Sequence, residues 1–264
     1  IENALSVAGV ASKLKHNLSD SYRVGQHTLY ATPSIGIALF PSDGADAATL
    51  LKNADTAMYH AKAQGRDNFQ FFSEGMNIAA IERMKSENGL RVAIEATRLG
   101  DAGEFHLYFQ PQFHLESNRI VGLEALVRWF HPEWGSVPPI QFIPIAEETG
   151  LIQPLGDWVF WESCRHLRMF RDAGIADIRV AVNLSAQQLR HADLPAVVHG
   201  ALACYELDPA DLELEITESA AMQNPSATIA ILTQLSDTGI VLSIDDFGTG
   251  YSSLAYLKHL PVQR

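Results

Sequence analysis

Four short apolar runs in the second half of the chain become acidic or amidic near their ends. They span residues 120–128, 178–183, 212–218 and 240–246. In the last three runs, Asn183, Glu215 and Asp245 follow one another at intervals of roughly 30 residues, which is about one strand-plus-helix unit when roughly 250 residues make eight such units. Parallel strands that bring oxygen ligands to one rim build the metal sites of (β/α)8 barrels. The spacing therefore predicts an α/β fold, a TIM-like (β/α)8 barrel.

The alternation of side chains along these runs supports parallel strands. Residues two apart on a strand share a face, so Glu124 lies with Arg128, and Glu213 with Glu215. The intervening residues are apolar and suit a face covered by helices, whereas the small or polar face suits a barrel interior. Half-exposed antiparallel strands alternate in the same way and remain an alternative. Helical stretches at 158–172 and 225–235 separate the runs and favour βαβ units.

Five motifs in this half resemble those of the EAL family of cyclic-di-GMP phosphodiesterases and stand in that family's order. They are YFQPQ at 108–112, EALVRW at 124–129, NLS at 183–185, EITES at 215–219 and DDFGTGYSSL at 245–254. Three common residues such as EAL match by chance, but five motifs at these separations are specific. The resemblance covers about residue 104 to the end of the chain.

The resemblance implies a two-metal site. In the family's pattern one metal is held by Glu124, Asn183, Glu215 and Asp245, while Asp246 serves the second metal, helps to bridge the pair and contacts substrate. Two metals about 3.5–4 Å apart activate a water and clamp phosphoryl oxygens. Carboxylates and an amide, without Cys or His, suit Mg²⁺ or Mn²⁺ better than zinc. A carboxylate pair that ends an apolar strand is also costly to bury unless a metal is present.

Three further residues receive roles from the same resemblance. Glu218 corresponds to the anchor of the loop that begins at Asp246, and glycines in that loop permit the break in the strand. We therefore expect Glu124, Asp245, Asp246 and Glu218 to be needed for catalysis. Arg128 offers a planar fork for a phosphate oxygen, and Gln110, at the end of the first barrel strand, is expected to contact substrate. The alternatives are a salt-bridge role for Arg128 and a hydrogen-bonded core amide for Gln110.

The sequence stops at residues 261–264, after an expected helix at 252–259 and where another strand should begin. A typical barrel needs roughly 90 more residues. In the family the next strand carries a lysine near the catalytic water, and later strands add a glutamate and a glutamine; none of these positions is in this sequence. We expect an omitted tail rather than a five-strand fragment, because an incomplete barrel leaves open strand edges.

The first 72 residues resemble a different family. The chain begins at Ile1 within an amphipathic helix at 4–14, followed by a strand at 32–41 and a helix at 47–64. The segments LKNADTAMY at 51–59 and AKAQGRDN at 61–68 resemble the C-terminal half of a GGDEF diguanylate cyclase domain. The Gly-Gly-Asp-Glu-Phe loop is absent from the sequence, so these residues cannot cyclise GTP.

Residues 73–103 are expected to connect the two regions, which gives a division into 1–72, 73–103 and 104–264. Apolar positions at near-helical spacing predict a helix at 73–98 that is weakened at Gly89, because Gly costs about 1 kcal/mol against Ala. A connector is favoured over a signal relay. Residues 99–103 are expected to form a flexible joint.

Composition restricts the partners. A net charge of −12 argues against a nucleic-acid polymer and makes attraction of an anionic dinucleotide a local effect of the metals and Arg128. No membrane segment or signal peptide is visible, and the two cysteines lack metal-ligand spacing and suggest a reducing compartment. We expect a cytoplasmic location, with a membrane tether upstream in the parent protein left open. A homodimer is compatible with the sequence.

These features leave three candidate functions. The first is a phosphodiesterase that opens cyclic-di-GMP to the linear dinucleotide pGpG. The second is a catalytically inactive receptor for the same ligand. The third is an unrelated metal-dependent barrel enzyme such as an aldolase, which does not explain five matching motifs. Inactive receptors typically lose a metal ligand, and here every ligand within the sequence is present, which favours the enzyme.

Overall fold

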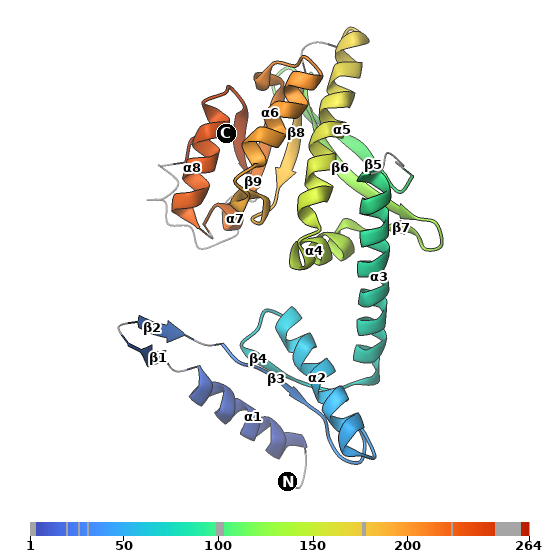
Figure 1. Cartoon of the computed structure of the whole chain (residues 1–264), viewed down its shortest axis with the longest axis vertical. Coiled ribbons are helices and arrows are strands. Elements are labelled where there is room, and N and C mark those ends of the chain that lie inside the picture. The colour runs from blue at the N-terminus through green and yellow to red at the C-terminus, as the bar shows by residue number, and fades with distance from the viewer. Residues whose placement is uncertain are drawn as a thin grey trace. The chain divides into compact units, whose positions relative to one another are not determined.

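Figure 1 shows a computed structural model of the chain. The structure describes residues 4–19, 21–25, 27–30, 32–98, 103–175, 178–222, 224–245 and 260–263. These residues form two compact units, Ile1–Lys85 and Ser86–Arg264. Each unit is described by itself.

The first unit is built around a βαβ element. Strand β3 (Ser34–Ile37) pairs in parallel with β4 (Asn68–Phe71), and helix α2 (Ala47–Ala63) connects them. Helix α1 (Ala4–Leu18) and the antiparallel pair β1 (Ser21–Val24) and β2 (His27–Tyr30) precede them. A Cβ atom at Gly36 would lie 1.9 Å from the backbone oxygen of Ala54, so only glycine lets α2 approach β3 this closely. The two helices that the sequence predicted are present. The predicted strand at 32–41 is shorter, because only residues Ser34–Ile37 pair with β4.

Helix α3 (Glu74–Arg98) continues without a break through Gly89, where the sequence predicted a weak point. A Cβ atom at Gly89 would lie 3.1 Å from the ring of Trp134 and 3.4 Å from the ring of His131. Glycine therefore allows these two stacked rings to pack on the helix, and that packing offsets the propensity cost. Residues 99–102 of the expected joint lie outside the described part of the chain.

The second unit contains a sheet in the order β10-β9-β8-β6-β5, with β7 (Gly135–Val137) paired to β6. Its strands are β5 (Phe105–Phe113), β6 (Ile120–His131), β8 (Arg179–Leu184), β9 (Leu212–Thr217) and β10 (Val241–Asp245). Strands β6, β8, β9 and β10 are parallel, as predicted. The first barrel strand, β5, runs antiparallel to β6 instead. The turn at residues 114–119 is too short for a crossover, which needs a dozen or more residues.

Helices cover one face of this sheet. Figure 1 shows α5 (Ile152–Asp172), α6 (Leu194–Cys204) and α8 (Pro225–Ser236) alongside it, with α4 (Pro139–Thr149) and α7 (Glu218–Met222) near its edge. The apolar strand positions Val180, Val182, Leu212, Leu214 and Leu242 are buried in one cluster with residues of these helices, among them Phe160, Leu167, Leu194, Val198 and Leu232. The predicted division into an apolar helix-covered face and a small or polar face is confirmed.

The loop after β8 is braced by a buried glutamine. Gln188, which is 2 % exposed, accepts a hydrogen bond from the backbone N–H of Ser185 through its Oε1 atom, at 3.0 Å. The same side chain lies against Gly156 of α5, where a Cβ atom would be 1.9 Å from Gln188 Nε2. A glycine within α5 thus leaves room for the residue that holds the loop following Asn183.

Gly156→Ala is expected to lower the free energy of unfolding by about 1–3 kcal/mol, because the added methyl overpacks a buried site. This loss should outweigh the better helix propensity of alanine. The matched control is Gly200→Ala in α6, where the new Cβ would meet Trp161 at an ordinary 3.7 Å. Urea unfolding of both variants checks the prediction, which is wrong if Gly156→Ala is as stable as Gly200→Ala.

Candidate active site

The predicted metal ligands of β6, β8 and β9 lie close together, with Asn183 and Glu215 near the carboxyl ends of β8 and β9 and Glu124 within β6. Asn183 Nδ2 donates a hydrogen bond to Glu124 Oε1 at 2.8 Å. Asn183 lies opposite Glu215 in the register of β8 and β9, and Glu215 lies opposite Ser243 of β10. Asp245 lies two residues further along β10, opposite Thr217. The parallel register therefore places Glu124, Asn183, Glu215 and Asp245 on one rim.

Negative charge accumulates around Glu215. Burial, together with the charges of Glu124, Glu213 and Asp245, raises the pKa of its carboxyl group to about 7, and a hydrogen bond from Gln112 opposes the shift. Several carboxylates close enough to perturb one another favour a cation between them. The oxygen donors of Glu124, Asn183, Glu215 and Asp245 fit a hard cation such as Mg²⁺ or Mn²⁺.

The described residues do not complete a metal centre by themselves. Among them, no group of three or more His, Cys, Asp or Glu side chains is close enough to hold an ion. The amide of Asn183 supplies part of the predicted ligand set, and Asp246 lies outside the described residues, together with the rest of the loop at 247–254.

Glu218 is the first residue of α7 and directly follows β9. Only 2 % of its surface is exposed. The loop that it is predicted to anchor begins at Asp246 and is not described, so the anchoring role stays a prediction.

Arg128 and Gln110 flank Glu124. Arg128 Nη1 donates a hydrogen bond to the backbone oxygen of Val127 at 3.0 Å, and its guanidinium carbon lies 5.7 Å from the ring centre of Tyr108. Neither described contact is an ion pair, so the salt-bridge alternative gains no support from this part of the chain. Gln110 is exposed and lies opposite Glu124 in the β5–β6 register. It stands inside β5 rather than at the end of the strand, because β5 continues to Phe113.

A cavity of about 410 Å³ opens at this rim between β6, β8, β9 and the helices α4 and α5. Arg128, Asn183, Ser185 and Thr217 are among its lining residues, whereas Glu124, Glu215 and Asp245 are not. Crevices at the carboxyl ends of parallel strands are the usual ligand sites of α/β folds. This cavity is therefore the candidate substrate site.

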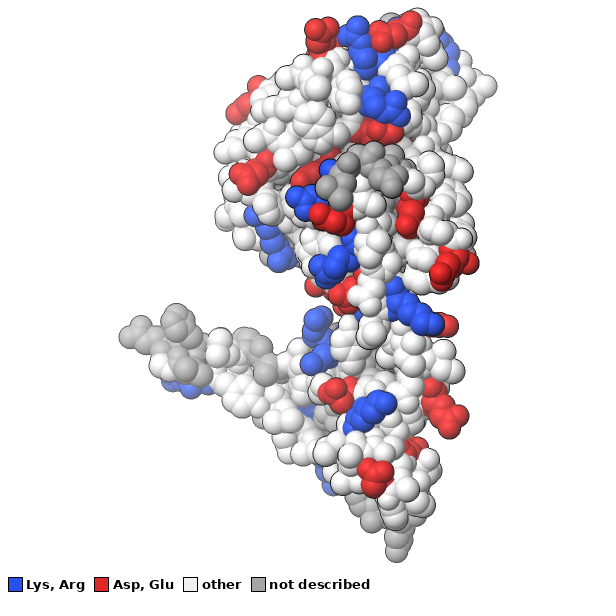
Figure 2. Space-filling model, turned by 45° about the vertical axis from the view of Figure 1, so that its right-hand side comes forward, with Lys and Arg blue, Asp and Glu red and all other residues white. Residues whose placement is uncertain are grey.

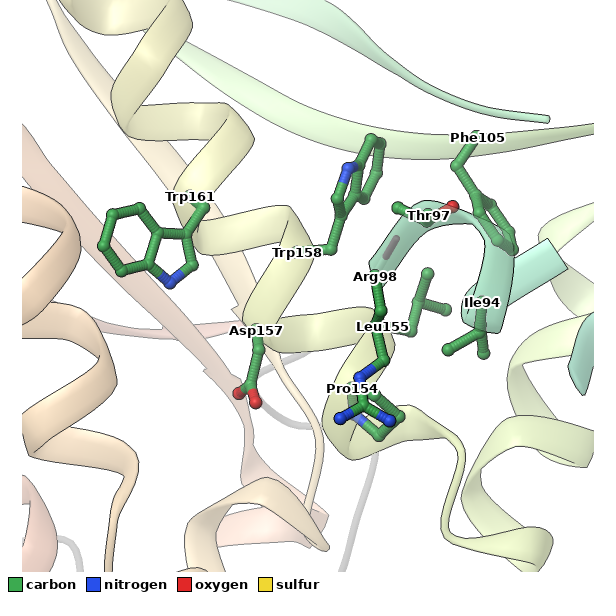
Figure 3. A pocket seen from close by; sticks show the side chains of 9 residues that line it. All are labelled: Ile94, Thr97, Arg98, Phe105, Pro154, Leu155, Asp157, Trp158 and Trp161. Atoms are coloured by element: carbon green, nitrogen blue, oxygen red, sulfur yellow. The ribbon is translucent and has the colours of Figure 1, made fainter. Parts of the chain in front are cut away.

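A second cavity, of about 330 Å³, lies between α3 and α5. Figure 3 shows Arg98 reaching from the end of α3 toward Pro154, with Phe105 and Trp158 on the other side. It contains none of the predicted metal or substrate residues, so we do not assign the active site to it.

Sequence reasoning gave no role to Gln112, although it stands in one of the motifs. Gln112 Nε2 donates a hydrogen bond to Glu215 Oε1 at 3.3 Å. The available signal was its spacing of two from Gln110, which puts both amides on one face of β5. The contact itself links residues far apart in the sequence, so spacing within one strand could not reveal it.

Figure 2 shows the charged side chains on one face of the molecule. Figure 2 shows acidic and basic side chains interspersed over the visible face of each unit. None of the described helices combines the length and apolar character that crossing a membrane requires.

Comparison with known proteins decides the family. The model of the EAL domain family matches residues 88–264. The chain belongs to the EAL domain family. A model described as "Diguanylate cyclase, GGDEF domain" matches residues 1–68. The EAL domain is thus preceded by GGDEF sequence, as the motifs predicted.

Relatives of this EAL protein have names that concern cyclic di-GMP. The chain is 47% identical over 254 residues to the bifunctional diguanylate cyclase/cyclic di-GMP phosphodiesterase MucR of Pseudomonas aeruginosa, covering 96% of the chain and 36% of MucR. It is 42% identical over 253 residues to the cyclic di-GMP phosphodiesterase NbdA of the same organism, covering 96% of the chain and 32% of NbdA. The chain therefore spans about a third of the length of these curated relatives.

A solved structure supports the barrel. The EAL region resembles the MucR phosphodiesterase in its c-di-GMP complex with a TM-score of 0.63 and 47% identity, covering 68% of this chain and 70% of that one. The parallel strands and covering helices of the second unit therefore belong to a TIM-like fold, of which this chain contains part.

Proposed function

We propose that the EAL domain hydrolyses cyclic-di-GMP to the linear dinucleotide pGpG with two divalent metal ions. The observation that carries the proposal is the convergence of Glu124, Asn183, Glu215 and Asp245 on one rim beside a cavity that contains Arg128. The names of the relatives support the choice of substrate.

In this proposal Glu124, Asn183, Glu215 and Asp245 hold one ion, and Asp246 serves the second. Mg²⁺ or Mn²⁺ would supply an activated water and neutralise charge on the phosphoryl oxygens. The hydrogen bond from Asn183 fixes Glu124 Oε1, which leaves Oε2 of Glu124 and the amide oxygen of Asn183 for the ion. Both residues are thus oriented before a metal binds.

The remaining residues act on the ligand or on the loop. Arg128 contacts a ligand phosphate, and Gln110, beside Glu124, contacts the bound dinucleotide. Glu218 holds the loop that begins at Asp246, so that Asp246 reaches the second ion and the substrate. A net charge of −12 means that an anionic ligand is attracted only at short range.

The second candidate is an inactive receptor for cyclic-di-GMP, which would use the same cavity. The intact set of predicted ligands favours the enzyme. The test is incubation of the full-length protein with cyclic-di-GMP and Mg²⁺, followed by chromatographic separation of the nucleotides. Formation of pGpG supports the enzyme, binding without product supports the receptor, and the absence of both overturns the proposal.

Arg128→Ala is expected to weaken cyclic-di-GMP binding by about 10- to 150-fold, because a charge-assisted hydrogen bond contributes about 1.5–3 kcal/mol. Calorimetric titration of the full-length protein in Ca²⁺ measures the affinity. The control is Arg119→Ala in the exposed turn between β5 and β6, which should bind as the unchanged protein does. Equal affinity of the two variants would remove Arg128 from the substrate site.

A further inference from the structure

The hydrogen bond between Gln112 and Glu215 joins two strands that are not neighbours in the sheet. Strands β6 and β8 lie between β5, which carries Gln112, and β9, which carries Glu215. Gln112 Nε2 nevertheless reaches Glu215 Oε1 at 3.3 Å. The contact therefore crosses the concave interior of the curved sheet, on the face that also carries Glu124 and Asn183.

Small residues on the intervening strands leave the path open. Gly122 of β6 lies opposite Gln112, and Ala181 of β8 lies opposite Glu124. A Cβ atom at Gly122 would stand 2.7 Å from Gln112 Oε1, closer than non-bonded atoms tolerate. Any side chain at position 122 would therefore displace the amide of Gln112 from its place.

A side chain at position 122 would clash mainly with the amide of Gln112. The next nearest atoms, Arg179 Cγ and the Arg179 backbone oxygen, would be at an ordinary 3.5 Å from the added Cβ. Gly122 lies within β6 and has no left-handed backbone angle. An alanine there should leave the strand intact and act on the position of the amide of Gln112.

A second polar pair separates the roles of the two glutamates of β9. Arg179 Nη1 donates a hydrogen bond to Glu213 Oε2 at 3.3 Å, and the Glu213 side chain is 4 % exposed. Glu213 shares a face with Glu215 but is engaged by this arginine. Gln112 instead contacts Glu215, the glutamate on the rim. Its amide is uncharged, so the hydrogen bond does not neutralise the charge of an ionised Glu215 carboxylate.

We propose that Gln112 is a positioning residue, which orients Glu215 for a divalent cation, and that Gly122 is glycine because the amide of Gln112 occupies the space of its side chain. The inference rests on the metal site of the proposed function and deepens it. Hydrogen-bond partners that orient a metal ligand typically contribute about 10- to 100-fold to metal affinity or activity.

The first test compares Gln112→Met with the unchanged full-length protein. Methionine has nearly the same length and no donor, so Glu215 loses its orienting contact. We expect Mn²⁺ binding, measured by calorimetry without substrate, to weaken by about tenfold. At saturating Mn²⁺ the KM for cyclic-di-GMP should stay within about twofold, since Gln112 acts through the metal. Gln141→Met on the exposed face of α4 is the control and should change neither quantity.

The second test uses the glycine. Gly122→Ala alone should weaken Mn²⁺ binding to a similar degree as Gln112→Met, with the thermal unfolding temperature nearly unchanged. In a Gln112→Ala background no amide remains to be displaced, so Gly122→Ala should add no further loss. Additive losses, or Mn²⁺ affinities within about twofold of the unchanged protein in both single variants, overturn the inference.

The outcomes distinguish this inference from the proposed function. If the unchanged protein binds Mn²⁺ and forms no pGpG, the phosphodiesterase proposal fails, and the affinities of the variants still decide the role of Gln112. If the unchanged protein hydrolyses cyclic-di-GMP and the variants bind Mn²⁺ equally well, only the inference fails. If the unchanged protein binds no Mn²⁺, both are wrong.

Discussion

Glu124→Ala in the full-length protein is expected to reduce cyclic-di-GMP hydrolysis by about 10³-fold or more. Glu124 is the predicted ligand that the amide of Asn183 holds at 2.8 Å. A metal ion supplies several kcal/mol of charge stabilisation to phosphoryl transfer, and each 1.36 kcal/mol corresponds to a tenfold change in rate. Loss of a direct ligand should therefore remove most of the rate, measured as pGpG formed at saturating Mg²⁺.

The control for this substitution is Glu116→Ala in the exposed turn at residues 114–119. It removes the same charge from the protein without touching the rim and should keep the full rate. Thermal unfolding without metal should show that both variants fold, because Glu124 lies among negative charges that repel one another. A Glu124→Ala enzyme that retains near-normal turnover would contradict the metal assignment.

The parallel strands could be predicted because the necessary information is local. In β8 and β9 each apolar residue alternates with a small or polar one, so the parity of Asn183 and Glu215 follows from the strand period. The interval between these residues then indicates a crossover helix. The register in the structure places the two side by side, which is why the rim could be anticipated from spacing.

The direction of β5 also follows from local information. Only the short turn at 114–119 separates the motif at 108–112 from β6, and the two strands are antiparallel. Loop length decides between a hairpin and a crossover. The prediction that Gln110 ends its strand was wrong, because β5 continues past it to Phe113.

Other features depend on contacts that no single segment encodes. Gly89 weakens an isolated helix, but the rings of His131 and Trp134 pack against it. Gln112 reaches Glu215 only because two intervening strands have small residues on the inner face. The raised pKa of Glu215 likewise arises from burial and from charges on three strands. Such effects require the three-dimensional arrangement, since sequence patterns describe one element at a time.

Replacing Mg²⁺ or Mn²⁺ with Ca²⁺ is expected to lower turnover by about 100-fold or more while cyclic-di-GMP still binds. Mg²⁺ requires octahedral oxygen ligands at about 2.0–2.1 Å, whereas Ca²⁺ takes 6–8 ligands at about 2.3–2.6 Å. The predicted ligands cannot easily spread to suit the larger ion. Asn183 donates a hydrogen bond to Glu124, and Gln112 donates one to Glu215, so each carboxylate is held in position by a residue of another strand.

An ion seated a fraction of an ångström away would shift the attacking and leaving oxygens relative to each other, and a misplacement of about 1 Å costs about 100-fold in rate. Initial rates at equal free concentrations of Mg²⁺, Mn²⁺ and Ca²⁺ measure the effect, with calorimetry in Ca²⁺ as the control for ligand binding. If Ca²⁺ supported the Mg²⁺ rate, the spacing between two metals would not limit catalysis. We expect binding to survive in Ca²⁺, because binding needs only positive charge at the rim, whereas hydrolysis also needs accurate placement of the two ions. If cyclic-di-GMP failed to bind in Ca²⁺, the low rate would reflect loss of bound substrate and the explanation by displaced metals would be wrong.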